Sequence, residues 1–90
     1  MYQTVLKSEA NQQIMLDVVR VLRKNDFILS TTAVNRETAF ADDLGLDSLD
    51  MVELRIKIED ELHLDLYDKD IEKLTTVGDF VDFLESKNNG

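Results

Sequence analysis

Apolar residues recur at helical spacing in the first quarter of the chain. Ile14, Val18, Val21 and Leu22 recur three or four positions apart, and Met15 and Val19 widen the apolar stripe that they form. This periodicity is typical of an amphipathic helix that buries one face. Ser8 and Glu9 indicate a helix start, and Asn25 is a plausible stop. We therefore predict a core-packing helix over residues 9–24.

Residues 25–46 form a connection that is longer than most loops in compact domains. It holds no proline and is not of low complexity. Apolar side chains are spread along its length: Phe27, Ile28, Leu29, Val34, Phe40 and Leu44. Side chains of this kind can fix a loop to a core, so we predict an ordered crossover with a helical turn near residues 38–41.

The segment 48–62 carries two separate apolar stripes. At about 100° per residue, one stripe falls within about 60° of arc and forms a core face of Met51, Leu54, Ile58 and Leu62. The other stripe lies about 130° away and consists of Leu49, Val52 and Ile56. Two explanations remain open for it. It packs beneath the long loop, or it is an exposed docking strip flanked by acidic side chains.

Two further helices complete the predicted fold. Residues 68–74 indicate a short helix that turns Ile71 and Leu74 inward, and residues 77–87 a longer one with Thr76 as its cap and Asp79 reaching back. No stretch alternates as a strand does. We predict an all-α bundle of four helices, one of them short, with a long ordered loop between the first and second. Residues 1–8 and 88–90 are expected to be flexible.

Charge is concentrated in the middle of the chain. The 90 residues have a net charge of −9, and residues 42–72 alone, with twelve acidic and three basic side chains, account for all of it. This argues against nucleic acid and anionic membrane surfaces as partners and favours a partner with a basic patch. The chain has no Cys, no apolar run of the ~20 residues that span a membrane, and no signal-peptide pattern. We expect a cytoplasmic monomer.

The candidate chemistry centres on Ser48. Gly45 allows a tight turn before it, Asp47 can cap the helix that follows, and Asp50 lies in the first turn of that helix. The hydroxyl is therefore expected at a helix N-terminus, where backbone N–H groups favour an attached anion such as a phosphodiester.

Catalysis and metal binding are not expected. His63, the sole histidine, lies fifteen positions after Ser48, or about 22 Å along one helix, and cannot activate it. The spacing from Asp68 resembles the start of a calcium loop, but Lys73 and Asp79 stand where that loop needs Gly and Glu. If Ser48 is functional, another enzyme modifies it.

Two blocks of sequence resemble the acyl carrier protein family. The run 42–50, Asp-Asp-Leu-Gly-Leu-Asp-Ser-Leu-Asp, with Val-Glu-Leu at 52–54, is similar to the attachment motif of that family. The run 74–79, Leu-Thr-Thr-Val-Gly-Asp, is similar to the start of its last helix. The resemblance covers roughly residues 9–87, which are expected to form the carrier domain.

The resemblance implies a site and its partners. Ser48 would carry 4′-phosphopantetheine, transferred from coenzyme A by a phosphopantetheinyl transferase, with Asp47 and Leu49 beside it. Acyl groups would travel as thioesters to loading and condensing enzymes of fatty-acid, polyketide or related synthesis, which have basic docking patches. The implied docking residues are Asp47, Leu49, Asp50, Val52, Glu53, Ile56, Glu59 and Asp60, and the implied acyl cavity is formed by Met51, Leu54 and Ile58.

Some residues depart from the family pattern. Arg55 and Lys57 add positive charge to a helix that the family usually keeps acidic or apolar, and Tyr67 replaces the proline that often precedes the third helix of the family. These departures favour a specialised carrier, and D-alanyl carriers share the fold. The alternative function is an acidic helical interaction module in which Ser48 stays unmodified.

Overall fold

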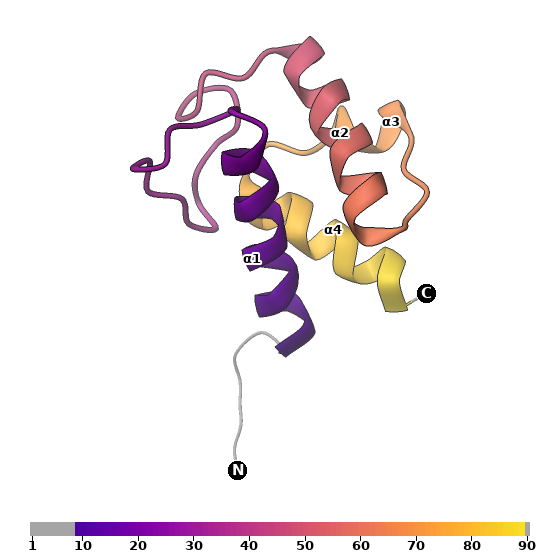
Figure 1. Cartoon of the computed structure of the whole chain (residues 1–90). Coiled ribbons are helices and arrows are strands. Elements are labelled where there is room, and N and C mark those ends of the chain that lie inside the picture. Colours follow the sequence, from indigo (N-terminus) through magenta and orange to yellow (C-terminus); the bar gives the residue numbers. More distant parts are fainter. Residues whose placement is uncertain (1–8, 90) are drawn as a thin grey trace.

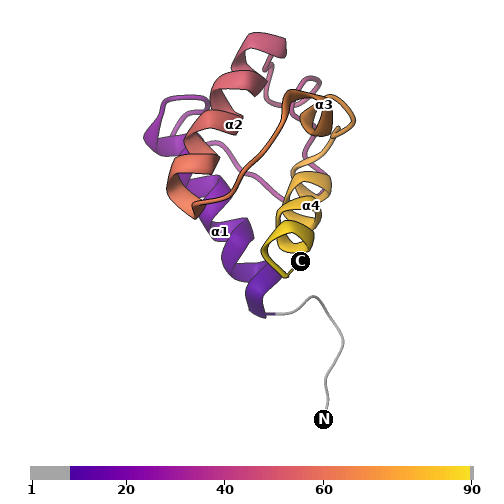
Figure 2. The same cartoon turned by 90° about the vertical axis from the view of Figure 1, so that its right-hand side faces the viewer.

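The computed structural model describes residues 9–89 and consists of four helices in a small bundle (Figures 1 and 2). They are α1 (Glu9–Lys24), α2 (Ser48–Leu62), α3 (Asp68–Ile71) and α4 (Val77–Asn89). The all-α prediction is confirmed, and α1 and α2 have the predicted bounds. Helix α3 ends three residues earlier than predicted, and α4 continues two residues further. The predicted flexible extension 1–8 lies outside the described residues, as does residue 90.

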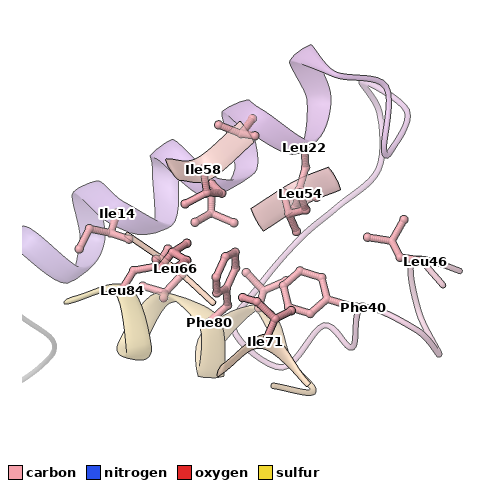
Figure 3. Close-up of a cluster of buried hydrophobic side chains, with 14 residues drawn as sticks. Ile14, Leu22, Phe40, Leu46, Leu54, Ile58, Leu66, Ile71, Phe80 and Leu84 are labelled. Carbon is pink, nitrogen blue, oxygen red and sulfur yellow. The ribbon is translucent and has the colours of Figure 1, made fainter. Parts of the chain in front are cut away.

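The core lies between α1, α2 and α4. Leu54 and Ile58 of α2 have no exposed surface and face α1 and α4, as the first apolar stripe predicts (Figure 3). The other buried apolar side chains are Ile14, Val18, Val21, Leu22, Phe40, Leu46, Leu66, Ile71, Val77, Phe80, Val81 and Leu84. Within residues 9–89, no helix combines the length and the apolar character that crossing a membrane requires.

The long loop between α1 and α2 is fixed to the start of α4. The Phe40 N–H donates to the Thr75 carbonyl at 3.0 Å, and the Val77 N–H donates to the Thr38 carbonyl at 2.9 Å. The Phe40 ring meets Phe80 edge to face, with centroids 5.9 Å apart. The prediction of an ordered crossover is confirmed. Its helical turn lies slightly later than predicted, because the Asp43 N–H donates to the Ala39 carbonyl at 3.0 Å.

Both long helices after this loop begin with reciprocal capping bonds. At the start of α4, the Asp79 N–H donates to Thr76 Oγ1 at 3.1 Å, and the Thr76 N–H donates to Asp79 Oδ2 at 3.1 Å. The bond from the Thr76 N–H lowers the pKa of the Asp79 carboxyl. Because that pKa is lower in the folded state, this cap stabilises the fold at neutral pH and is lost as the pH falls through the folded pKa.

Gly78 is required by a close approach of the loop to α4. Its N–H donates to the Arg36 carbonyl at 2.9 Å, and a Cβ at this position would lie 2.8 Å from the same oxygen. We expect Gly78→Ala to lower the free energy of unfolding by about 1–3 kcal/mol, because the backbone must shift to make room. Urea denaturation measures this loss.

Gly45 provides a contrasting control for Gly78. Its φ is +69°, and a Cβ there would meet nothing within 4 Å. The cost of a side chain at position 45 is therefore conformational, and Gly45→Asn should recover much of what Gly45→Ala loses, because asparagine tolerates this region. Gly78→Asn should bring no such recovery, and equal recovery at both positions would contradict the steric account of Gly78.

Candidate functional site

Ser48 is exposed and is the first residue of α2. The chain reaches it through Gly45, whose φ of +69° makes the turn, and Leu46, which is buried and donates its N–H to the Phe40 carbonyl at 3.0 Å. The loop is thus anchored two residues before the serine. This anchor fixes where α2 begins and leaves the hydroxyl facing solvent.

A capping box holds the start of α2. The Asp50 N–H donates to Asp47 Oδ1 at 2.9 Å, and the Asp47 N–H donates to Asp50 Oδ2 at 3.0 Å. The predicted roles of both residues in starting the helix are confirmed. The two carboxylates also stand at the positive end of the helix dipole, so they offset part of its attraction for an added phosphodiester. The cap therefore positions Ser48 more than it binds an anion.

The histidine of α2 is out of reach of Ser48. His63 is the left-handed C-cap of α2, with a φ of +56°, and is exposed at the end opposite Ser48. The distance between the two ends of a fifteen-residue helix rules out proton transfer between these side chains. His63 therefore cannot activate Ser48 as a nucleophile.

The second apolar stripe of α2 is exposed and does not pack beneath the long loop. Leu49 is 74% exposed and Ile56 44%, while Val52 is half-buried. Three carboxylate side chains around this stripe are exposed, those of Asp47, Glu53 and Asp60, and Asp50 is partly so. The apolar and acidic residues expected in a docking face therefore lie together on the surface that begins at Ser48, with one exception.

Glu59 is the exception, and its expected place in the docking face needs correction. Its side chain is only 25% exposed, and its oxygens accept bonds from Arg55 and from the Leu66 N–H, both at 2.8 Å. Arg55 is likewise turned inward, with its side chain 17% exposed. Of the two cations noted as departures on α2, only Lys57 is exposed.

An apolar pocket of about 410 Å³ opens beside Ser48. Met51 lines it, as expected for an acyl cavity, but Leu54 and Ile58 do not: both are wholly buried in the core. The remaining lining comes from the end of the long loop, the start of α2, and α3 with the residues that follow it: Ala41, Leu46, Asp47, Ser48, Val52, Asp68, Ile71, Glu72 and Leu74. The sequence predicted that Ile71 and Leu74 turn inward, but carried no signal that they approach Ser48.

These features define a class of protein: a helical carrier domain with an exposed hydroxyl at a helix start and an apolar pocket beside it. Comparison with known proteins supports this assignment to a class. The family described as "Phosphopantetheine attachment site" matches residues 16–84. The mitochondrial acyl carrier protein of Saccharomyces cerevisiae is 36% identical over 85 residues, which cover 94% of this chain and 68% of the yeast protein.

A solved structure shows the same fold. The crystal structure of an acyl carrier protein from Thermotoga maritima superimposes with a TM-score of 0.77 at 26% identity, covering 93% of this chain and 96% of that one. The chain belongs to the acyl carrier protein family. It is an acyl carrier with a phosphopantetheine arm, and it is not an enzyme.

Proposed function

We propose that Ser48 is the residue that bears the arm and that the arm carries acyl groups to fatty-acid, polyketide or related synthesis enzymes. In the attachment step, Ser48 Oγ bonds to the phosphorus next to the pantetheine part of coenzyme A. The pyrophosphate P–O bond breaks, adenosine 3′,5′-bisphosphate leaves, and the transferase takes the hydroxyl proton. Because the chain has no Cys, the terminal thiol of the arm is then the only thiol in the molecule.

The observation that supports Ser48 is its place at the capped start of α2. Ser30 and Ser86 are also exposed, but Ser30 lies in the long loop and Ser86 within α4. Among the serines that the structure describes, only Ser48 combines exposure with a fixed backbone, an adjoining apolar pocket and a flanking acidic helix surface. The family match over residues 16–84 lies within the carrier domain that we propose for residues 9–87.

We define the docking face as Leu49, Val52 and Ile56 with Asp47, Asp50, Glu53 and Asp60. Its acidic side chains favour partners with basic patches, which applies to the transferase and to the enzymes that load and unload cargo. The pocket lined by Met51 is the proposed shelter for the acyl chain. We also propose that the protein is a monomer and that it is located in the cytoplasm. Cell fractionation would distinguish the cytoplasm from the mitochondrion named for the yeast relative.

The test of attachment is a change in mass. We expect the apo-protein, incubated with coenzyme A and a promiscuous phosphopantetheinyl transferase, to gain one phosphopantetheinyl group, and peptide mapping to place it on Ser48. If the folded protein gains nothing under conditions that modify another carrier, the unmodified interaction module becomes the better interpretation.

The docking face gives a separate prediction. Glu53 is exposed on α2 one turn from Leu49, so Glu53→Lys should oppose a basic partner. At low salt we expect kcat/KM for arm attachment to fall roughly tenfold, and the difference to shrink as salt screens the charges. Asp65→Lys is a matched control, because it makes the same charge change beyond the far end of α2. Equal losses in both variants would contradict a localised docking face.

A further inference from the structure

Two side chains one turn apart on α2 hold the backbone of Leu66 from both sides. Arg55 Nη1 donates to the Leu66 carbonyl at 3.1 Å, and the Leu66 N–H donates to Glu59 Oε2 at 2.8 Å. Arg55 Nη1 also contacts Glu59 Oε1 at 2.8 Å, which closes a ring of three bonds. Leu66 is only 2% exposed. The connection between α2 and α3 is therefore fixed at its buried point.

The same arginine reaches α3. Its Nε contacts Asp68 Oδ1 at 2.8 Å, and Asp68 is the first residue of α3. Helix α3 has four residues, and its N-cap residue Tyr67 makes no side-chain capping bond. A helix this short has no stability of its own. Its position depends on what holds it, and Arg55 is the cation that links it to α2.

Helix α3 is also a wall of the pocket beside Ser48. Asp68 and Ile71 of α3 and the following residue Glu72 line that pocket together with Met51 and Val52 of α2. Because both helices contribute lining, the distance between α3 and α2 determines the width of the pocket next to the proposed attachment residue.

We propose that Arg55, Glu59 and Asp68 form a clamp that holds α3 against α2 and sets access to the pocket beside Ser48. Arg55 is the positioning residue, and release of its contacts opens the pocket to an acyl chain or frees the chain for a partner. The inference rests on the proposed function in one respect, namely that the pocket receives cargo.

The chemistry of the clamp requires arginine. A planar guanidinium can contact two carboxylates and a carbonyl at once from a fixed fork, whereas a lysine ammonium cannot span the same set. Exposed ion pairs contribute little, and the Asp68 side chain is 63% exposed. The strength of the clamp therefore comes mainly from Arg55 and Glu59, which are mostly shielded from water and bond to the buried backbone of Leu66, two residues before α3. Removal of the arginine leaves partners unsatisfied, which costs more than the pair contributes.

Hydrogen exchange of the apo-protein tests the clamp without any arm or cargo. In Arg55→Met we expect protection of the Leu66 amide and of the α3 amides to fall at least about tenfold, equivalent to about 1.4 kcal/mol, while α1 and α4 stay protected. Lys57→Met is the matched control, since Lys57 is exposed and makes no ion pair among the described residues. It should change nothing at α3.

Arg55→Lys keeps the charge and provides a variant in case Arg55→Met fails to fold. It should also lose protection at Leu66, because the charge alone does not reproduce the fork. Unchanged protection around α3, or a loss spread evenly over α1 and α4, would overturn the clamp.

The link to cargo is tested on the holo-protein loaded with an octanoyl thioester. Hydroxylamine should cleave the thioester several-fold faster in Arg55→Met than in the unsubstituted protein or in Lys57→Met. Equal cleavage rates together with lowered protection of α3 would show that the clamp does not govern access, and so overturn the proposal. If no variant accepts the arm at all, the proposed attachment at Ser48 fails, while the exchange experiment still decides whether the clamp exists.

Discussion

Ser48→Ala is expected to abolish attachment of the phosphopantetheine arm and to leave the fold intact. The hydroxyl oxygen is the atom that bonds to phosphorus, so its removal leaves no acceptor at the start of α2. The side chain is exposed, and alanine is a good helix former. We therefore expect the free energy of unfolding to change by no more than about 0.5 kcal/mol. Intact mass after incubation with coenzyme A and transferase measures the first effect, and urea denaturation the second.

Two matched serine variants control this experiment. Ser30→Ala and Ser86→Ala also remove one exposed hydroxyl each, but away from the start of α2. Both should gain the arm at the rate of the unsubstituted protein. A phosphopantetheinyl adduct on folded Ser48→Ala would show that another residue accepts the group, and would remove the basis for assigning the site to the capped start of α2.

The positions of the long helices could be predicted from the sequence because local signals agree there. In α1, apolar spacing and stop residues coincide, and the helix ends at Lys24 as expected. In α2, Asp47 and Asp50 both point to a start at Ser48, and the capping box forms. Helix α3 differs because it has no side-chain cap. Nothing local sets its bounds, and they depend on its packing against α2.

The position of Ser48 could also be predicted from neighbouring residues in the sequence. Its surroundings could not, because they are formed by residues far away in the sequence. Helical periodicity gives the direction of a side chain and does not identify what lies in that direction. At about 100° per residue, Arg55 and Glu59 lie about 40° and 80° from Met51, between the core stripe and the outer face. From the sequence, both residues were predicted to be surface charges. Their burial becomes evident only when the Leu66 backbone and α3 are placed against that edge of α2.

Phe80→Ala is expected to be the most destabilising of the substitutions considered. The Phe80 side chain has no exposed surface and lies at the centre of the core, where its ring meets that of Phe40 (Figure 3). Removal of a fully buried phenyl group costs about 3–5 kcal/mol through lost burial and the cavity that remains. A 90-residue domain has about 5–13 kcal/mol of stability in all. The variant should therefore lose a large share of its free energy of unfolding.

Phe83→Ala is the matched control, three residues further along α4. Phe83 is only partly buried, and Lys87 Nζ lies 5.8 Å from its ring centroid. We expect it to lose less than half as much as Phe80→Ala in urea denaturation, because its ring leaves no enclosed cavity. Equal losses would contradict the placement of Phe80 at the core centre.

The same pair of variants tests how the core positions the site. Phe80 packs on Phe40, the Phe40 carbonyl accepts the Leu46 N–H, and Leu46 anchors the turn that leads to Ser48. Hydrogen exchange at the Leu46 amide should therefore be accelerated more in Phe80→Ala than in Phe83→Ala. The difference should persist when urea concentrations are chosen so that both variants have the same global stability. If exchange at Leu46 follows global stability alone in both variants, the start of α2 is held by its capping box without support from the aromatic pair.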